Sequence, residues 1–329
     1  MTTSFGQTPQ GEAKLYTISG GRIRAAITDL GATLVSLWVD GVDVVLGYDD
    51  ASGYLSNEGF LGAVVGRNAN RIENSRFILN GETIQLTPNE GTTNLHSGPE
   101  PYNVRMWKVD ACEAASIRMS LVSPDGDQGF PGEAKIAVTY AIENDALVVT
   151  YEAVSDKDTV FNFTNHAYFN LAGEDQTGKA MEQVLQMPCE IFNPDDAANI
   201  PTGEMRSVEG TPFDFRQPKA LGRDIGEDYE SLILQGGYDH NFVVNSNPCA
   251  VLTDPESGRT MTVSTDCPGV QIYTANFLDV VGKKGVHYGK RSGVCLETQF
   301  APNSVNHPEW PQPFTKAGET YRSVTKFQF

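Results

Sequence analysis

Apolar and polar residues alternate with a period of two along most of the chain, and turns rich in Gly, Pro, Asn and Asp separate the alternating segments. This alternation is typical of half-buried β-strands, whereas few segments repeat apolar residues with the longer period of a helix. Strands are expected over residues 22–30 and 33–39, which Gly31 separates, and over residues 117–122, 134–142 and 146–154. The pattern therefore predicts an all-β protein.

Local turn chemistry refines this prediction. Residues 76–86 read as a hairpin, because the pair Asn80-Gly81 tolerates the positive φ values of a tight two-residue turn. Residues 143–145 form the expected turn of an antiparallel meander, and residues 123–132 form a long loop rich in Gly. A short helix is expected within residues 226–234.

Many short strands at this spacing imply antiparallel sheets stacked in a large β-sandwich. The sequence has no internal repeat, no low-complexity tract and no linker at which composition changes. We therefore expect one domain over residues 1–329, with residues 1–11 as a flexible N-terminal tail.

Charge and cysteine content limit the possible partners. The chain has 24 Lys and Arg residues against 42 Asp and Glu residues, a formal net charge of -18. Nucleic acid and anionic membrane surfaces would be repelled. The five cysteines are widely spaced and form no Cys-x-x-Cys pair, which favours reduced thiols in a cytoplasmic protein. Neither a signal peptide nor a membrane-spanning apolar stretch is recognisable, so no membrane partner is expected.

The segment 164–171 places His166 among β-forming aromatic residues, where neither core packing nor a turn calls for a histidine. One interpretation is a core histidine bonded to backbone. The other is an imidazole that faces a cleft and exchanges protons near neutral pH, with apolar walls formed by its sequence neighbours; these are Phe161, Phe163, Tyr168 and Phe169.

Polar residues also interrupt two other apolar strands, at Gln271 and Glu297. Each could be an ordinary sheet-surface residue, but Glu297 in a pocket would suit a general base. Asp239 and His240 set an acid beside a base, yet adjacent strand residues point to opposite faces. Only one of that pair can face a given site.

Two further clusters are ambiguous taken singly. Residues 66–72 contain Arg67 and Arg71 with two asparagines, which suits either a solvated connection or donors for sugar hydroxyls. His96 precedes a turn of small residues and could be a hydrogen-bonded loop residue or a ligand-binding one.

The five histidines show none of the spacings of a zinc site, so no metal is expected. The sequence also lacks a Gly-x-Ser-x-Gly elbow, a phosphate-binding loop and a dinucleotide fingerprint. What remains is proton transfer on a neutral, hydroxyl-rich substrate.

Taken together, these motifs resemble the aldose 1-epimerase (galactose mutarotase) family from about Tyr16 to Phe329. The ordered set carries the resemblance: Asn70-Arg71, Asn94-Leu95-His96, Thr164-Asn165-His166, Tyr238-Asp239-His240-Asn241-Phe242, Gln271 and Leu296-Glu297-Thr298-Gln299. It implies a galactose mutarotase-like supersandwich with few short helices, an open sugar cleft on one sheet face and no cofactor.

By the same resemblance, Glu297 is the general base, His166 the general acid and His96 an assisting group. The resemblance also implies a set of residues that hold sugar hydroxyls, and this set includes the three catalytic residues. Its members are Asn70, Arg71, His96, His166, Tyr168, Asp239, Gln271 and Glu297. The chain departs from the common family pattern at Ser97, Ala167 and Asn303.

The implied reaction interconverts the α and β anomers of free aldoses such as glucose and galactose by acid/base ring opening and closure. Two other functions are compatible with parts of the pattern: a non-catalytic sugar-binding module, and an epimerase of phosphorylated sugars, which would need additional cations. The preferred aldose (glucose, galactose, xylose or maltose), and whether the protein is a monomer or a homodimer, stay open from the sequence.

Overall fold

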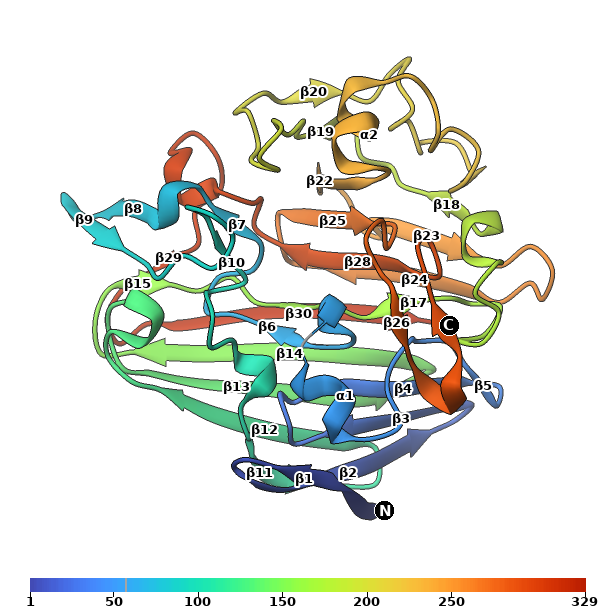
Figure 1. The fold of residues 1–329 in the computed structure, drawn as a ribbon, viewed down its shortest axis with the longest axis horizontal. Coiled ribbons are helices and arrows are strands. Elements are labelled where there is room, and N and C mark those ends of the chain that lie inside the picture. The colour runs from blue at the N-terminus through green and yellow to red at the C-terminus, as the bar shows by residue number, and fades with distance from the viewer. Residues whose placement is uncertain (57) are drawn as a thin grey trace.

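The computed structural model describes residues 1–56 and 58–329 as a β-protein built on three large antiparallel sheets (Figure 1). The largest has nine strands, in the spatial order β11 (Lys108–Cys112), β12 (Ser116–Ser123), β13 (Ala134–Glu143), β14 (Ala146–Ser155), β30 (Thr320–Gln328), β24 (Thr260–Thr265), β23 (Ala250–Thr253), β18 (Val184–Gln186) and β21 (Lys219–Ala220).

Two further sheets complete the architecture. A five-stranded sheet runs in sequence order through β1 (Thr2–Thr8), β2 (Gly11–Gly20), β3 (Ile23–Thr28), β4 (Leu34–Val39) and β5 (Val42–Asp43). A six-stranded sheet has the order β17 (Tyr168–Phe169), β28 (Val294–Gln299), β25 (Gly269–Tyr273), β22 (Asp239–Val243), β19 (Ile191–Phe192) and β20 (Arg206–Ser207).

Short elements connect these sheets. The two-stranded pairs are β6 (Val64–Val65) with β16 (Thr164–Asn165), β7 (Arg71–Ile72) with β10 (Asn94–Leu95), β8 (Arg76–Leu79) with β9 (Glu82–Gln85), β15 (Thr159–Val160) with β29 (Phe314–Thr315), and β26 (Val280–Val281) with β27 (His287–Tyr288). The α-helices are α1 (Ala51–Leu55) and α2 (Glu230–Gln235), and the 3-10 turns are Glu58–Phe60, Glu73–Ser75, Tyr102–Val104, Asp127–Gly129, Ala180–Glu182, Lys283–Gly285 and Ser304–Asn306.

One large hydrophobic core lies between the nine-stranded sheet and the two smaller sheets. It joins Val138 and Phe327 of the nine-stranded sheet to Leu37 of the five-stranded sheet and Leu296 of the six-stranded sheet. Contact across the layers is direct, because the rings of Phe169 and Phe327 lie 5.1 Å apart. This arrangement confirms the predicted β-sandwich.

Most predicted elements form close to their expected positions. The meander is β12 to β14, the helix near residue 230 is α2, and the hairpin is β8 with β9. Its turn residues Asn80 and Gly81 have φ values of 53° and 83°, as the sequence requires. Among the described residues, no helix has the length and apolar character needed to span a membrane.

The N-terminal segment differs from the expected tail. Residues Thr2–Thr8 form the edge strand β1, which pairs with β2, and Phe5 is buried against Tyr54 of α1. A single buried ring and a ladder of backbone hydrogen bonds therefore order a segment whose other side chains are mostly polar. One domain over residues 1–329 stays a prediction.

Candidate active site

A cavity of about 350 Å³ opens beside the six-stranded sheet, on the face turned away from the core. Its volume falls at the lower end of the range for small-molecule sites. It is lined by polar residues (Asn70, Arg71, His96, His166, Asp239, Asp279 and Glu297), aromatic residues (Phe60, Tyr168, Tyr273 and Phe277) and the smaller set Gly59, Leu95, Leu278 and Val280.

Strand register explains why these side chains meet. Asp239 of β22, Tyr273 of β25 and Cys295 of β28 are cross-strand partners, so they point to the same side of the sheet. Glu297 lies two positions from Cys295 and shares that side, whereas Leu296 points into the core. The period of two thus turns one face of β28 toward the cavity.

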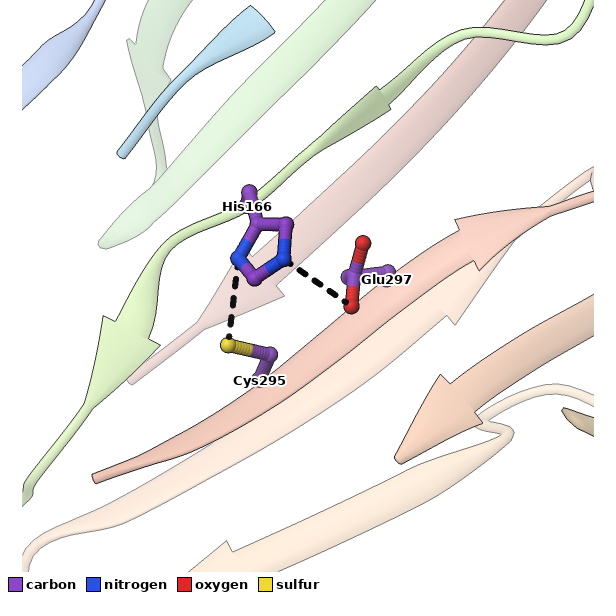
Figure 2. Close-up of side chains that lie close together, drawn as sticks. All are labelled: His166, Cys295 and Glu297. Atoms are coloured by element: carbon purple, nitrogen blue, oxygen red, sulfur yellow. Dashed lines mark hydrogen bonds and ion pairs between the residues drawn. The ribbon is translucent and has the colours of Figure 1, made fainter. Parts of the chain in front are cut away.

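His166 and Glu297 form a buried acid/base pair. The Nε2 atom of His166 lies 3.8 Å from Oε1 of Glu297 (Figure 2). The imidazole stacks on Tyr168, with ring centroids 5.0 Å apart, and on Phe60 at 5.9 Å. These contacts fix the plane of the ring and direct its nitrogens along the sheet face.

Burial shifts both groups of this pair toward their neutral forms. Burial raises the pKa of Glu297 well above its usual value, the charge of Asp239 raises it further, and Arg71 opposes the shift. Burial lowers the pKa of His166 to about 4. Glu297 therefore holds a proton more readily, and His166 less readily, than either would in water.

His96 differs from His166 in its hydrogen bonding, because its Nδ1 atom accepts a hydrogen bond from the backbone N–H of Asn70 at 3.1 Å. The backbone N–H of His96 donates in return to the carbonyl oxygen of Asn70. Burial, with the nearby charges of His166 and Arg71, lowers the pKa of His96 well below its usual value. Neutral His96 therefore carries its proton on Nε2 and offers a fixed donor to the cavity.

Both members of this reciprocal pair lie in the left-handed region of backbone space. The φ angle is 62° at Asn70 and 50° at His96. Residues held in this region are over-represented at ligand sites, where surrounding contacts compensate for the strain. The pairing of β7 with β10 holds the two loops together.

Two charged residues of the cavity lining, Arg71 and Asp239, have hydrogen-bond partners outside the lining. Arg71 binds Glu90 through two contacts, Nε to Oε2 at 2.6 Å and Nη2 to Oε1 at 2.8 Å. Gln271 donates through Nε2 to Oδ1 of Asp239 at 2.8 Å. Burial, chiefly, raises the pKa of Asp239, while the charge of Arg71 lowers it. The charge of Arg71 therefore favours the ionised form of Asp239.

His166, Cys295 and Glu297 offer nitrogen, sulfur and oxygen atoms within 4.8 Å of one another. A metal would need each donor at about 2.0–2.3 Å. However, the two close contacts use different ring nitrogens, because Nδ1 of His166 faces the sulfur and Nε2 faces the carboxylate (Figure 2). The geometry suits proton transfer better than metal binding.

The family model "Aldose 1-epimerase" matches residues 14–328. The chain belongs to this family. A galactose mutarotase from Bos taurus is 39% identical over 338 residues, covering 99% of this chain and 97% of the relative. An aldose 1-epimerase from Escherichia coli is 38% identical over 317 residues, covering 92% and 91%.

Solved aldose 1-epimerase relatives share the fold. The aldose epimerase homologue from C. elegans superimposes with a TM-score of 0.88 at 31% identity, covering 96% of this chain and 98% of that one. A galactose 1-epimerase from Lactobacillus acidophilus gives a TM-score of 0.88 at 28% identity, covering 100% and 97%. The predicted galactose mutarotase-like sandwich is therefore confirmed.

Most residues implied by the resemblance to the aldose 1-epimerases lie at the cavity. Glu297, His166, His96, Asn70, Arg71, Tyr168 and Asp239 all line it, although their roles stay predictions. Gln271 is not among the lining residues, but it donates a hydrogen bond to the carboxylate of Asp239. His240 points to the opposite face and packs on Phe213, as strand alternation requires of the neighbour of Asp239.

Two sequence interpretations need correction. Of the four aromatic residues expected to wall His166, only Tyr168 lies at the cavity, because Phe161, Phe163 and Phe169 point into the core. The ambiguous Arg67 is neither solvated nor a sugar donor. It is buried and bonds the loop 123–132 through the carbonyl oxygens of Pro131 and Gly132.

Sequence reasoning missed several parts of this site. Phe60 ends the 3-10 turn Glu58–Phe60 and Glu90 lies on a loop, and neither segment has a periodic pattern that pointed to them. Tyr273 could have been found, since it lies two positions from Gln271 on the same strand. The sequence also did not indicate Phe277. In the structure it lines the cavity with a largely exposed side chain, which is unusual for so apolar a ring.

Proposed function

We propose that this protein is an aldose 1-epimerase that interconverts the α and β anomers of free aldoses such as glucose and galactose. The observation that carries the proposal is the buried pair of His166 and Glu297, 3.8 Å apart, at a cavity whose other polar groups suit sugar hydroxyls. Membership of the family supports it.

Ring opening needs one base and one acid. The carboxylate of Glu297 accepts the proton of the C1 hydroxyl, while the imidazolium of His166 donates the Nε2 proton to the ring oxygen. The C1–O5 bond breaks, and an aldehyde forms at C1. Rotation about the C1–C2 bond then presents the other face of the aldehyde.

Ring closure reverses both roles. Neutral His166 takes the proton from the O5 hydroxyl as O5 attacks C1, and the protonated Glu297 returns a proton to the carbonyl oxygen. The product is the opposite anomer, and both residues regain their starting forms. No proton, electron or group is consumed.

The pair needs one proton in total, whichever residue holds it. Burial raises the pKa of Glu297 and lowers that of His166, so the resting proton favours Glu297. Its transfer to His166 gives the carboxylate and imidazolium that ring opening requires. The two groups therefore titrate as one coupled unit.

Other groups bind the sugar and do not exchange protons with it. Neutral His96 donates through Nε2, Arg71 donates through the part of its guanidinium left by Glu90, and Asp239 accepts from hydroxyls. Interactions that are equal in the ground and transition states lower KM without raising kcat. Tyr168 and Phe60 stack on His166 and limit its motion.

Charge at the cavity favours neutral sugars over phosphorylated ones. Among the described lining residues, Arg71 is the only permanent cation, and Glu90 already neutralises it. Asp239, Asp279 and Glu297 add carboxyl groups at the same cavity. A phosphate would lack the free cations that usually bind it.

Polarimetry of freshly dissolved α-glucose and α-galactose tests the proposal. The enzyme should speed mutarotation, and Glu297→Gln should lower kcat by about 10² to 10⁴ if proton transfer limits the rate. Glu82→Gln removes the same charge from an exposed site on β9 and serves as the matched control. A kcat of Glu297→Gln within a few-fold of the control would overturn the assignment.

The same measurement separates an enzyme from a sugar-binding module, which would bind sugars without changing the rate of mutarotation. A cytoplasmic location, a monomeric or homodimeric state and the preferred aldose stay predictions or open questions from the sequence.

A further inference from the structure

The imidazole of His166 lies between two side chains of one strand. Its Nε2 atom faces Glu297, and its Nδ1 atom lies 3.5 Å from the Sγ atom of Cys295 (Figure 2). Both partners project from the same face of β28, and the side chain of Cys295 is completely buried. The partner of Nε2 is part of the proposed reaction, whereas the partner of Nδ1 has no role in it so far.

The proposed reaction constrains which atom holds the second ring proton. Nε2 must alternate between a lone pair and an N–H group, because it gives its proton to the ring oxygen and takes it back. Neutral His166 must then keep its one proton on Nδ1. The partner of Nδ1 therefore has to accept a hydrogen bond in every step.

The Sγ atom of Cys295 can serve as this acceptor. A thiol sulfur accepts weakly and carries no charge, and burial raises the pKa of Cys295 well above its usual value, which keeps it a thiol. A carboxylate at this position would stabilise the imidazolium and make it a weaker acid. A neutral sulfur orients the ring without that cost in acidity.

His96 shows the contrast within the same cavity. Its Nδ1 atom accepts from the backbone of Asn70, so its proton sits on Nε2. The rings of His96 and His166 are 5.5 Å apart, and their Nδ1 atoms have partners of opposite character. One histidine becomes a fixed donor, and the other becomes the proton exchanger.

We propose that Cys295 is a positioning residue that accepts the Nδ1 proton of His166 and thereby makes Nε2 the nitrogen that exchanges protons with substrate. The inference rests on the proposed acid role of His166. It concerns the tautomer of a ring, however, and can be measured without any sugar.

Nitrogen-15 NMR of protein labelled in its histidine rings reads the tautomer directly. At neutral pH, the wild-type spectrum should show His166 protonated on Nδ1 and His96 protonated on Nε2, with His166→Asn and His96→Asn variants assigning the signals. An unprotonated Nδ1 on neutral His166 would overturn the proposal whatever the enzyme does.

Kinetics of Cys295 variants supply the second readout. Cys295→Ala should lower kcat about tenfold with little change in KM, because a general acid that is not held in one orientation transfers its proton to the substrate less efficiently. It should also mix the two tautomers of His166. Cys295→Ser keeps a hydrogen-bond acceptor, so its His166 should be protonated on Nδ1 and its kcat should be close to that of wild type. A hydroxyl accepts more strongly than a thiol and stabilises the imidazolium, so the acid limb of the profile of kcat against pH should move to higher pH.

Cys249→Ala is the matched control, since it removes another buried thiol that bonds the carbonyl oxygen of Val263 away from the cavity. Thermal unfolding of all variants identifies any loss of folding. Unchanged kcat, pH profile and tautomer in folded Cys295→Ala would contradict the positioning role. Loss of catalysis in Glu297→Gln tests the proposed function separately.

Discussion

Arg71 and Glu90 are joined by two parallel hydrogen bonds, at 2.6 and 2.8 Å, in which the guanidinium meets both carboxylate oxygens. Glu90 thus fixes the orientation of the one permanent cation among the described lining residues. Two parallel hydrogen bonds restrict the orientation of a guanidinium more than one contact would restrict the ammonium group of a lysine.

We therefore expect Arg71→Met to raise KM about five- to tenfold, since each lost hydrogen bond to sugar is worth about 1 kcal/mol. The change in kcat should be smaller. Glu90→Gln keeps the shape but weakens the pair, so its KM should rise less than that of Arg71→Met. Initial rates over a range of sugar concentrations provide both constants, and a fall in kcat without a change in KM would contradict a binding role.

His166→Asn should show the opposite kinetic pattern. Asparagine keeps a donor near the position of the imidazole but cannot relay a proton at neutral pH, so kcat should fall by about 10² or more while KM changes little. Polarimetry at saturating sugar measures this. An effect confined to KM would make His166 a sugar contact, with His96 the next candidate for the acid.

Acid should destabilise the fold through its buried histidines. Burial lowers the pKa of His240 to about 3, whereas an unfolded histidine titrates near ~6.5. Between these values the unfolded chain binds the extra proton, so the free energy of unfolding falls as pH decreases from about 6.5. A single such group contributes a slope of about 1.4 kcal/mol per pH unit.

Urea unfolding at pH 6 and pH 5 checks this slope. His240→Phe fills the aromatic site beside Phe213 and Phe192 without a titrating group, so its slope should be smaller than that of wild type by about 1.4 kcal/mol per pH unit. Comparing slopes cancels the opposite contribution of Glu297, whose raised pKa favours the folded state at low pH. Equal slopes would mean that His240 is protonated in the folded protein.

Prolonged dialysis against EDTA should leave activity unchanged, because the histidines show no zinc-site spacing and the two nitrogens of His166 contact different partners. Activity is compared with an undialysed sample. Loss of activity that zinc restores would show that Cys295 and Glu297 can rearrange around an ion.

The sequence predicted most where local chemistry decides the structure. Asn80-Gly81 favours one turn type, and that turn sets the register of its hairpin. Period-two alternation likewise places Glu297 and Leu296 on opposite faces of β28 before any contact is known. The polar edge strand β1 was missed because only Phe5 is buried along it.

What the sequence could not predict depends on tertiary packing. β17 has two residues and exists because Tyr168 and Phe169 pair with β28. Glu90 reaches Arg71 from a loop, and nothing in its neighbours distinguishes it from a surface acid. The family resemblance implied which residues are catalytic, but the partner of each nitrogen of His166 depends on how the chain folds and could not be predicted from the sequence.

The strand β30 follows every other described strand in the sequence, yet it lies inside the nine-stranded sheet between β14 and β24. The meander that ends at β14 therefore keeps one edge unpaired until β30 folds against it. Phe327 then packs beneath Phe169, under the sheet that carries Glu297. A chain without β30 would leave the facing edges of β14 and β24 unpaired and open to pairing with other chains.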